Sequence, residues 1–534
     1  MPSAVAASEI SAGLEMGSVP RLLEVSDLVD PQAPLNLYCA LRQERFPFLL
    51  ESVEKSGQRA RFSFVGAGPA AVVTVKGRRF EIEICERKRG IDEGIEKGTR
   101  GRTKEGIEKG TEEGIEKGIK ELLRERLEPV ASVDVAGDGV FVLSGEIRHG
   151  MDLFDLLRSA IPSRCGPSKF GRQAFLGGGI GYLAYDLVAE RIERSSTSDK
   201  PDAKFGLFEK SFVFDHLTGK VCLAVAPLLP QDDPEKIAEE TIERLRGLHL
   251  EEPEGGDLGP LSVEADSAGP FEESVLSAKE HILDGDIFQV VLSRRARVRL
   301  GNPDPVLLYR RLREINPSPY TYIFEFGDHA LVGASPETLF SLSDRVVTTN
   351  PIAGTCPRGG SREEDDLLAA RMLEDEKEKA EHVMLVDLGR NDVRSVSRAG
   401  SIRVEDFMSV LRYSHVQHIE TTVRGTLREE CDSFDAARAI FPAGTLSGAP
   451  KIRAMEIIDD LEGSARGIYG GGVGYFSADG SADFAITIRS VVIKGETAIV
   501  QAGAGIVADS DPHREFMETE RKMAAMKRAL GVEL

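Results

Sequence analysis

Two acidic pairs in the second half of the chain have the spacing of a metal-binding helix face. Glu378 and Glu381 lie three residues apart in DEKEKAEH, and Glu515 and Glu518 repeat that spacing in HREFMETERK. Residues three apart on a helix project from one face, so each pair presents two carboxylates together, and Lys522 follows one turn after the second pair. Two such faces could hold Mg2+, which takes one or two carboxylates and leaves positions for an anionic ligand. A surface salt-bridge stripe would explain either pair alone.

The same half carries groups that suit an anionic ligand. Arg489 in TIRS offers a planar fork of donors that can grip a carboxylate at two points, and Tyr469 in YGGGVGY adds a phenol. QAGAG, from Gln501 to Gly505, predicts a turn whose backbone N–H groups could cradle an anion. His418 in YSHVQH could act as a base near neutral pH. A structural salt bridge, an ordinary hairpin and a core histidine remain alternative explanations.

Positioning these groups requires helices and strands that alternate irregularly. Residues 271–283 predict an amphipathic helix, and the alternating apolar residues from Val290 to Leu300 predict a strand. The sequence VVTVKGRRFEIEI at 72–84 predicts a hairpin. The motifs GGGIGY at 177–182 and GGGVGY at 470–475 are typical of strands that another backbone approaches closely. This mixture favours an α+β fold over a doubly wound parallel sheet.

Composition shifts divide the chain into two predicted domains. Residues 1–20 are rich in Ala, Ser and Gly and predict a disordered tail, which an N-terminal domain follows at 21–250. The polar stretch 251–270 predicts a linker, and 271–534 forms the second domain. Within the first domain, 86–127 is of low complexity and contains GIEKG three times. Because glycine disfavours helix and a four-residue repeat drifts around a helix, we expect a mobile charged insertion there.

Composition and charge exclude several classes of protein. The 534 residues are 41% apolar and 29% charged, which is ordinary for a globular chain of two or three domains. The 67 basic against 88 acidic residues leave a net charge of -21, which disfavours nucleic acid as a partner. No apolar run approaches the roughly 18 residues of a membrane-spanning helix, and no secretion signal is recognisable. The six cysteines form no C-x-x-C pair, so we expect a cytoplasmic protein without membrane association.

Ten motifs follow one another in a characteristic order. They are LLES (49–52), RFSFVG (61–66), GGGIGYLAYD (177–186), FDH (214–216), PIAGT (351–355), DEKEKAEHVMLVDLGRND (375–392), YSHVQH (413–418), FPAGTLSGAPK (441–451), YGGGVGY (469–475) and QAGAGIV (501–507). Their order resembles that of the chorismate-utilising enzymes, and most closely the anthranilate synthase component I family. The resemblance implies a fold of two packed, mainly antiparallel sheets sandwiched between helices, in four layers αββα.

The resemblance implies a Mg2+-dependent carbon–oxygen lyase that converts chorismate and ammonia to anthranilate and pyruvate, the first step of tryptophan biosynthesis. Two positions favour this branch. Gln289 stands where isochorismate and salicylate synthases carry a lysine that activates water. Ala353 stands where aminodeoxychorismate synthases typically carry a lysine that can attack the ring. Since neither side chain can do so, ammonia remains as the attacking group.

The resemblance also assigns roles to single residues. It makes Glu381 and Glu518 the ligands of Mg2+, and Glu378 the acid that protonates the leaving C4 hydroxyl group. It assigns further catalytic roles to His418, Lys522 and Thr445; substrate binding to Gly354, Thr355, Tyr469, Arg489, Gly503, Ala504 and Gly505; and feedback binding of tryptophan to Ser52, Pro319, Tyr320, Thr321, Val473 and Tyr475.

Ammonia is expected to come from glutamine through a separate amidotransferase subunit. A class I glutaminase presents its cysteine on a G-x-C-x-G-like elbow, and none of the six cysteines has those flanks. At the inhibitor site, Thr321 stands where the family often has methionine, which removes apolar contact area and bears on the strength of inhibition.

Three other interpretations stay open at this point. An aminodeoxychorismate synthase component I would keep pyruvate attached to the ring in most of its members. A catalytically silent homologue would only bind chorismate or serve as a scaffold for the amidotransferase, although the full set of acidic, His and Lys residues argues against decay. A Mg2+-dependent enzyme that acts on another small dicarboxylate is the third interpretation, and it rests on the residues alone and not on the family resemblance.

Overall fold

The computed structural model describes residues 20–52, 61–85, 104–135, 141–163, 169–192, 194, 198, 200–251, 255–412 and 416–533. Most of the predicted tail and residues 86–103 of the predicted insertion lie outside these ranges.

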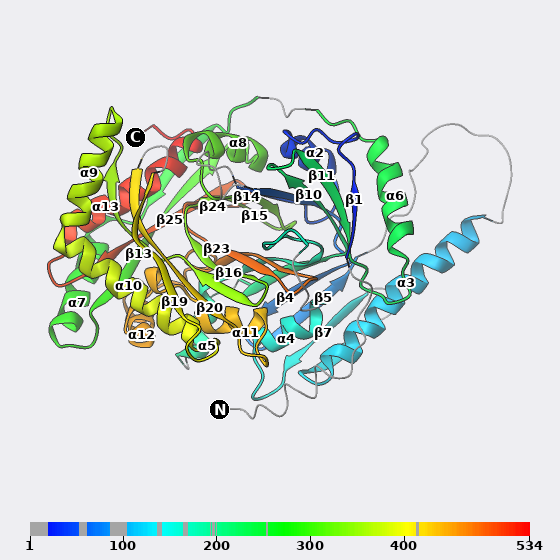
Figure 1. The fold of residues 1–534 in the computed structure, drawn as a ribbon, viewed down its shortest axis with the longest axis horizontal. Coiled ribbons are helices and arrows are strands. Elements are labelled where there is room, and N and C mark those ends of the chain that lie inside the picture. The colour runs from blue at the N-terminus through cyan, green and yellow to red at the C-terminus, as the bar shows by residue number, and fades with distance from the viewer. Residues whose placement is uncertain are drawn as a thin grey trace.

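Two antiparallel sheets lie at the centre of the molecule (Figure 1). Within the described ranges, the first sheet runs β1 (Arg21–Glu24), β11 (Lys220–Val225), β10 (Lys210–Asp215), β3 (Phe62–Gly66), β2 (Phe48–Glu51), β14 (Tyr320–Glu325), β15 (Ala330–Ser335), β24 (Ser490–Lys494), β25 (Thr497–Ile506), β13 (Gln289–Leu300) and β12 (Pro260–Ala265), with β21 (Gly448–Ala449) also paired to β13. The second runs β18 (Ile352–Pro357), β20 (Val416–Thr426), β17 (Val346–Thr349), β16 (Thr338–Ser343), β23 (Ala482–Ile486), β22 (Gly472–Ser477), β8 (Gly178–Leu183), β9 (Ala203–Phe208), β4 (Ala71–Lys76), β5 (Arg79–Ile84), β7 (Val142–Ile147) and β6 (Ala131–Val135), with β19 (Arg403–Arg412) paired to β20.

Helices cover the outer faces of this pair of sheets (Figure 1). On the first sheet pack α2 (Pro34–Leu41), α6 (Pro234–Arg246), α7 (Ala268–Leu283), α8 (Pro305–Ile315), α12 (Lys451–Glu462) and α13 (Pro512–Ala529). On the second pack α3 (Lys104–Leu127), α4 (Leu153–Ala160), α9 (Arg362–Glu374), α10 (Glu376–Arg394) and α11 (Ser433–Ile440), while η1 (Tyr185–Leu187), α5 (Val188–Arg191) and η2 (Gly444–Leu446) are short. The predicted four-layer αββα fold is therefore confirmed. Among the described helices, none combines the length and the apolar character needed to cross a membrane.

An aromatic core fills the space between the sheets. Phe48 of the first sheet packs edge-on against Phe208 of the second, with ring centroids 4.9 Å apart. Phe64 and Tyr475 make a similar contact between the sheets at 5.5 Å. Aromatic pairs in this geometry add to the burial of their large apolar area, so this cluster fixes how the two sheets lie on one another.

The two predicted domains are not separate in the structure. Each sheet takes strands from both: in the first, β2 pairs with β14, and in the second, β8 pairs with β22. The predicted linker 251–270 is partly ordered structure, because it contains β12 and the beginning of α7. Long-range strand pairing of this kind leaves no trace in local composition. The polar stretch 251–270 was therefore interpreted as a boundary between domains.

The two glycine-rich motifs form adjacent central strands. Gly181 of β8 lies opposite Gly474 of β22. A Cβ atom on Gly181 would lie 1.9 Å from the Lys204 carbonyl oxygen, and one on Gly474 would lie 2.0 Å from that of Asp483. Close approach of neighbouring backbones therefore explains both motifs without a ligand, as the sequence indicated.

The predicted mobile insertion is wrong for residues 104–127, which form α3. Ile119, Leu123 and Leu127 recur at four-residue steps near its end and are almost fully buried in the core beside α4 and β7. Burying a leucine or isoleucine contributes roughly 1.5–3 kcal/mol, which outweighs the cost of about 1 kcal/mol for each glycine in a helix. Tertiary packing has therefore overridden local propensity.

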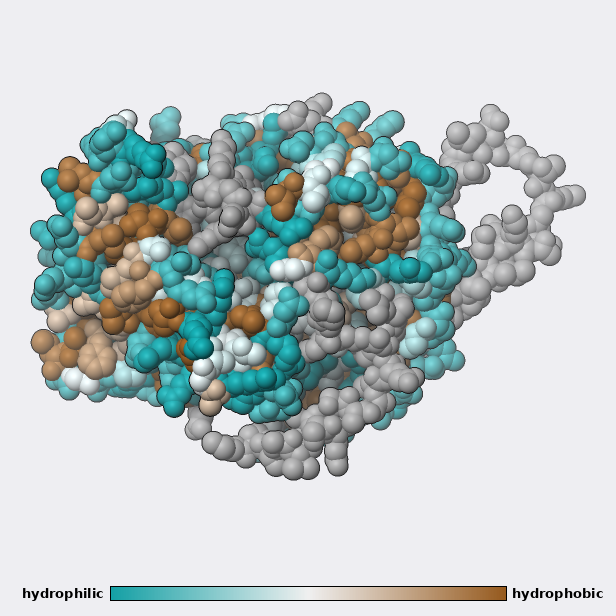
Figure 2. Space-filling view, viewed as in Figure 1, coloured by the Kyte–Doolittle hydropathy of each residue, from teal (hydrophilic) through white to brown (hydrophobic). Residues whose placement is uncertain are grey.

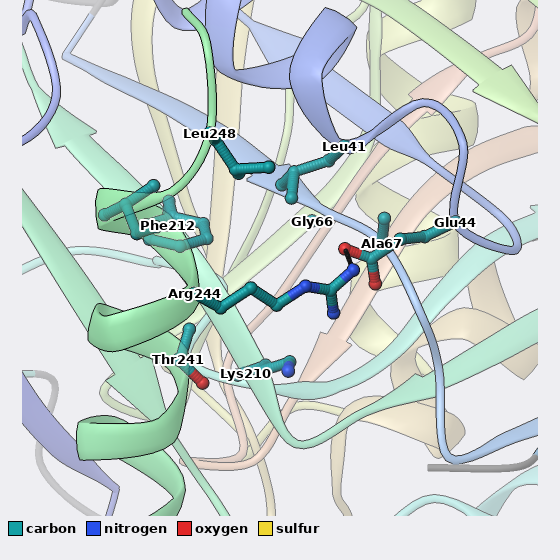
Figure 3. Close-up of a pocket in the computed structure, with 10 residues that line it drawn as sticks. Leu41, Glu44, Gly66, Ala67, Lys210, Phe212, Thr241, Arg244 and Leu248 are labelled. Carbon is teal, nitrogen blue, oxygen red and sulfur yellow. Dashed lines mark ion pairs between the residues drawn. The ribbon is translucent and has the colours of Figure 1, made fainter. Parts of the chain in front are cut away.

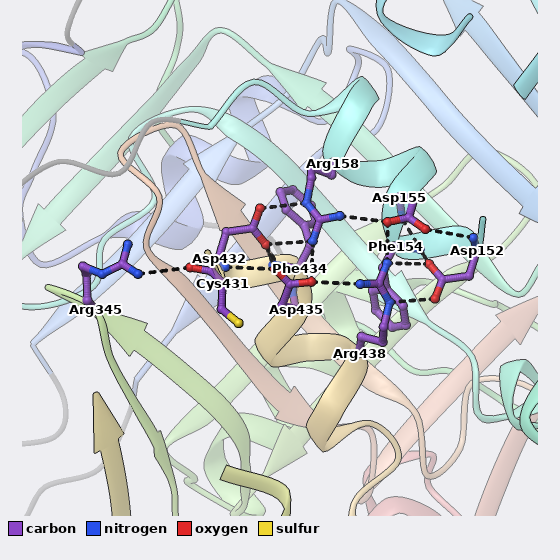
Figure 4. Close-up of polar contacts among 10 residues, drawn as sticks. All are labelled: Asp152, Phe154, Asp155, Arg158, Arg345, Cys431, Asp432, Phe434, Asp435 and Arg438. Carbon is purple, nitrogen blue, oxygen red and sulfur yellow. Dashed lines mark hydrogen bonds and ion pairs between the residues drawn. The ribbon is translucent and has the colours of Figure 1, made fainter. Parts of the chain in front are cut away.

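A reciprocal ionic cluster joins α4 to α11 (Figure 4). Arg158 of α4 donates to two aspartates at the start of α11, and Arg438 of α11 donates to two at the start of α4, at distances of 2.6–2.7 Å. The cluster comprises Asp152, Asp155, Arg158, Asp432, Asp435 and Arg438. The same aspartates cap their own helices. Because α11 leads directly into η2, which carries Thr445, the cluster anchors that segment to the first half of the chain.

The packing of α3 can be tested by truncating one core side chain. Leu123→Ala should lower the free energy of unfolding by about 2–5 kcal/mol, because it leaves a cavity between α3 and the sheet. Urea unfolding of the full chain measures this, with the exposed Glu125→Ala on the same helix as the control. A loss below about 0.5 kcal/mol for Leu123→Ala would instead support a solvated spacer.

Candidate active site

The two acidic pairs lie on helices that face each other. Asp375 caps the start of α10 by accepting from the backbone N–H groups of Lys377 and Glu378, and Asp511 caps α13 in the same way. Burial raises the pKa of Glu378, and the charges of Glu381 on its own helix and Glu518 on α13 raise it further. The predicted helical faces are therefore confirmed, and their carboxylates lie close enough to repel one another.

Hydrogen bonds hold the side chains of Glu381 and Lys522 in place. Gln289 of β13 donates its Nε2 proton to Glu381 Oε1 at 2.8 Å. Lys522 forms an ion pair with Glu518 at 2.7 Å and donates to the Gly503 carbonyl oxygen at 3.0 Å. These contacts connect α10 and α13 to the strand pair β13 and β25.

The facing carboxylates fit a divalent cation in their chemistry. Burial raises the pKa of Glu515, and the charge of the neighbouring Glu518 raises it too. The positive charges near this second pair therefore do not fully neutralise its carboxylates. Among the described residues, no group of three or more His, Cys, Asp or Glu side chains is already arranged as a complete metal site. Two carboxylates with water and ligand oxygens are sufficient for Mg2+, which seldom uses an all-protein cage. Carboxylate oxygens are the ligands that Mg2+ prefers, so the chemistry of Glu381 and Glu518 suits such an ion and the site stays a prediction.

The QAGAG segment is part of a strand and not the predicted turn. Gly503 and Gly505 lie within β25, opposite Ser293 and Val291 of β13. The strand β24 pairs with β25 only from Thr497 to Val500, so the edge of QAGAG extends beyond it. Glycine often marks a turn in a sequence, but here it leaves room for a neighbouring side chain. A Cβ atom on Gly503 would lie 3.0 Å from the Tyr469 hydroxyl oxygen. The backbone of this edge lines the site together with Tyr469.

Arg489 supplies positive charge on the same side of the site. Its backbone has φ of 49°, a left-handed conformation that is uncommon for a residue other than glycine and that clusters at functional sites. Its guanidinium group lies 3.5 Å from the Asn316 side-chain oxygen. Its charge also lowers the pKa values of His418 and Glu337, so the three residues lie in one region.

His418 is neutral and has a defined tautomer. Its Nδ1 atom lies 2.8 Å from the Gly354 carbonyl oxygen and 3.1 Å from the Thr355 hydroxyl oxygen. Because a carbonyl oxygen only accepts, the proton lies on Nδ1 and the lone pair on Nε2. Burial, together with the charges of the nearby Arg489 and Lys522, lowers the pKa of His418 to about 4. The histidine is thus a weaker base at neutral pH than the sequence suggested.

Glu337, between β15 and β16, is a site residue that the sequence analysis missed. Burial raises its pKa to about 8, and the charge of Glu420 contributes, whereas Thr445, Lys522 and Arg489 lower it. It is therefore protonated at neutral pH and able to donate a proton. A small pocket lies beside it, lined also by Thr445 of η2 and by α10. In the sequence, the signal that could have identified Glu337 is a lone acidic residue between two apolar strands.

Several buried polar atoms near this cleft have no hydrogen-bond partner within the part of the chain that the structure describes. They include Gln289 Oε1 and Thr487 Oγ1, and Thr487 lies two residues before Arg489. Buried polar atoms are almost always paired, so these atoms are available to a bound polar molecule.

The predicted tryptophan residues come together at a second place. Thr321 lies opposite Glu51 in the β2–β14 pair, which brings Ser52 beside Pro319 and Tyr320. Val473 and Tyr475 belong to the apolar cluster between the sheets that Tyr320 also contacts. The Tyr320 hydroxyl group donates to Asp483 at 2.8 Å, and burial raises the pKa of that carboxyl group to about 6.

A further pocket lies away from both groups of residues (Figure 3). It lies between α2, α6, β3 and β10. Arg244 reaches into it and pairs with Glu44 at 2.8 Å. Its strands are at the opposite end of the first sheet from β13 and β25, so it is separate from the candidate active site.

Comparisons with known proteins agree over nearly the whole chain. A family model described as chorismate binding enzyme matches residues 125–528. A protein of Haloferax volcanii named anthranilate synthase component 1 is 44% identical, over 94% of this chain and 92% of that protein. One of the same name from Thermococcus kodakarensis is also 44% identical, over 94% and 98%. Among solved structures, anthranilate synthase component I from Streptococcus pneumoniae TIGR4 is similar, with a TM-score of 0.68, 35% identity, and coverage of 88% of this chain and 92% of that one.

The raised pKa of Glu337 predicts a pH-dependent cost to folding. Between pH 4.5 and 8 the unfolded chain ionises this group while the folded chain keeps it protonated, so stability falls as pH rises through that window and then levels off. Glu337→Gln removes this cost, so its stability relative to wild type should rise with pH by up to about 1.4 kcal/mol per pH unit. Urea unfolding from pH 5 to 8.5 measures it, with the exposed Glu280→Gln as control. A difference independent of pH would contradict the assignment.

Proposed function

The chain belongs to the family of chorismate binding enzymes, and we propose that it is the component I subunit of an anthranilate synthase, converting chorismate and ammonia to anthranilate and pyruvate. Relatives of that name match it over almost their full length. The observation that carries the proposal is Gln289, which lies hydrogen-bonded to Glu381 in the site. A carboxamide cannot take a proton from water as a lysine amine can, so the site favours an amine nucleophile.

We propose that Glu381 and Glu518 hold Mg2+, with Glu378 and Glu515 supplying further negative charge around it. When bound, the cation would provide a Lewis acid for the ring carboxylate of chorismate. Burial and the charges of neighbouring glutamates raise the pKa values of Glu378 and Glu515, which supports this proposal, because a divalent cation would stabilise both carboxylates.

The second carboxylate of the substrate needs positive charge of its own. Chorismate is a dianion, and the chain has a net charge of -21, so long-range electrostatics oppose its binding. Arg489 and the Tyr469 hydroxyl group suit the enolpyruvyl carboxylate, and the edge of β25 beyond β24 offers backbone N–H groups. Gly354, Thr355 and Ala504 would line the same cleft, and Lys522 would stabilise anionic oxygens.

The first step adds ammonia at ring C2 while the C4 hydroxyl group leaves as water. That departure needs a proton, and two carboxyl groups can supply it. Glu337 has a pKa of about 8 and is protonated at neutral pH, whereas the raised pKa of Glu378 would fall beside a bound cation. We therefore assign the proton donor to Glu337, and an electrostatic role near the cation to Glu378.

The second step eliminates pyruvate and makes the ring aromatic. A ring proton must leave in this step, and His418 presents its Nε2 lone pair because Nδ1 donates to Gly354. Its pKa of about 4 makes it a weak base that returns the proton readily. Thr445 lowers the pKa of the Glu337 carboxyl group, which assists release of its proton in the first step.

We also propose that ammonia comes from a glutamine amidotransferase subunit that docks beside the site. Exposed apolar side chains support this. Leu283 and Phe288, at the turn between α7 and β13, are 77% and 72% exposed, and Ile452 of the adjoining α12 is 48% exposed. Figure 2 shows apolar side chains on this face among polar ones. The turn leads directly to Gln289, so a partner there could deliver ammonia to the site.

Tryptophan would inhibit the enzyme by binding between the sheets, near Ser52, Pro319, Tyr320, Thr321, Val473 and Tyr475. Tyr320 and Thr321 belong to the same sheet as β25 and Gln289, so a ligand there could shift the active-site strands.

The proposed reaction can be tested without any partner. Purified protein incubated with chorismate, Mg2+ and an ammonium salt should form fluorescent anthranilate and release one pyruvate for each. Omitting Mg2+ or adding a chelator should abolish both products. An aminated ring that keeps its enolpyruvyl group would indicate an aminodeoxychorismate synthase, and no conversion would leave only a binding or scaffold role.

The proton donor can be identified by comparing two isosteric variants. Glu337→Gln should lower kcat by about 10²–10⁴-fold with little change in the apparent Mg2+ affinity, because an amide cannot donate a full proton. Glu378→Gln should mainly weaken the binding of Mg2+. Steady-state kinetics with ammonia measure both. Near-wild-type turnover of Glu337→Gln, with loss of turnover in Glu378→Gln, would return the acid role to Glu378.

A further inference from the structure

Gln289 is a buried carboxamide of which only one end is satisfied. The residue is 3% exposed, and its Nε2 atom donates to Glu381 Oε1 at 2.8 Å. Its Oε1 atom is buried and has no hydrogen-bond partner among the residues that the structure describes. An unpaired buried acceptor is unfavourable, so a ligand that donates a hydrogen bond to it is stabilised.

The orientation of this carboxamide follows from its neighbour. A carboxylate accepts hydrogen bonds only, so the nitrogen must face Glu381 and the oxygen must point away from it. The reverse orientation would bring two acceptors together. The oxygen is therefore the group that Gln289 presents to a ligand beside the acidic helix.

The backbone around Gln289 leaves the side chain little freedom. Gln289 pairs with Ala449 of β21, and the next residue, Val290, pairs with Ile506 of β25. A Cβ atom on Gly505 would lie 2.6 Å from Gln289 Nε2 and 3.7 Å from Glu381 Oε1. The glycine thus reserves the space that the carboxamide occupies.

We propose that Gln289 Oε1 binds the ammonia molecule that attacks the substrate. Neutral ammonia has three N–H donors and one lone pair, so a hydrogen bond to an acceptor holds it while the lone pair stays free for the ring. A protonated lysine at this position would offer donors only and would occupy that lone pair. This inference rests on the proposed function and specifies how its nucleophile is positioned.

The reaction balances without a proton passing through Gln289. The nitrogen lone pair forms the C2–N bond, and the C4–O bond breaks with its electron pair on oxygen. The oxygen takes a proton from the carboxyl donor and leaves as water, and the substituted ammonium loses one proton, which restores the donor through solvent. Gln289 is therefore a positioning residue that acts through one hydrogen bond to the nucleophile.

Steady-state kinetics of Gln289→Met test this, because methionine keeps the length and removes both polar groups. The KM for ammonia, measured as free NH3 at fixed pH and saturating chorismate, should rise about 10-fold or more, as expected for one lost hydrogen bond. The KM for chorismate should change by less than about 3-fold. Gln289→Asn, whose shorter carboxamide cannot reach, should behave alike and replaces the first variant if that does not fold.

A matched control separates this role from the loss of any buried carboxamide. Gln417 of β20 is fully buried, and its side chain donates to the Asp365 carbonyl oxygen and accepts from Arg412. Gln417→Met should lower thermal stability and leave the KM for ammonia unchanged.

Two results would overturn the proposal. An unchanged KM for ammonia, with weaker Mg2+ binding by calorimetry, would mean that Gln289 only holds Glu381. An equal rise in the KM values for ammonia and chorismate would mean a general disturbance of the site. If wild-type protein itself makes no anthranilate with ammonium, the proposed function fails, and that outcome is distinct because it is read before any variant is made.

Discussion

The repulsion among four glutamates between α10 and α13 is the constraint on which the rest of the site depends. Glu378, Glu381, Glu515 and Glu518 project from two capped helices, and burial and mutual charge raise the pKa values of one member of each pair. Lys522 offsets part of that charge by pairing with Glu518. A cation that completes the balance, as we propose for Mg2+, would turn an unfavourable cluster into a binding site for a carboxylate.

Burial acts in opposite directions on the two groups that we propose for proton transfer. It raises the pKa of Glu337 to about 8 and lowers that of His418 to about 4, so both are neutral at pH 7. A neutral acid and a neutral base can coexist beside Arg489 without forming an ion pair that would disable both. In the proposed mechanism, burial thus prepares one group to give a proton and the other to accept one.

Local sequence patterns predicted the elements but not their long-range relations. The three-residue spacing of Glu378 and Glu381, and the alternation from Val290 to Leu300, depend on one element each and were confirmed. QAGAG was misinterpreted because glycine in a strand and glycine in a turn look alike until a neighbour such as Tyr469 is known. Leu123 shows the same limit: a glycine-rich helix is unfavourable alone and stable only against a core. Glu337 was missed because its protonated state depends on burial, and burial leaves no signature in the spacing of residues along the sequence.

The shared-cation arrangement can be tested directly by diffraction from crystals soaked with Mn2+, an anomalous scatterer that replaces Mg2+. The account predicts one strong anomalous peak between α10 and α13, within coordination distance, about 2.1 Å, of carboxylate oxygens from both Glu381 and Glu518. A peak that contacts only one of the two helices, or lies elsewhere in the molecule, would contradict it.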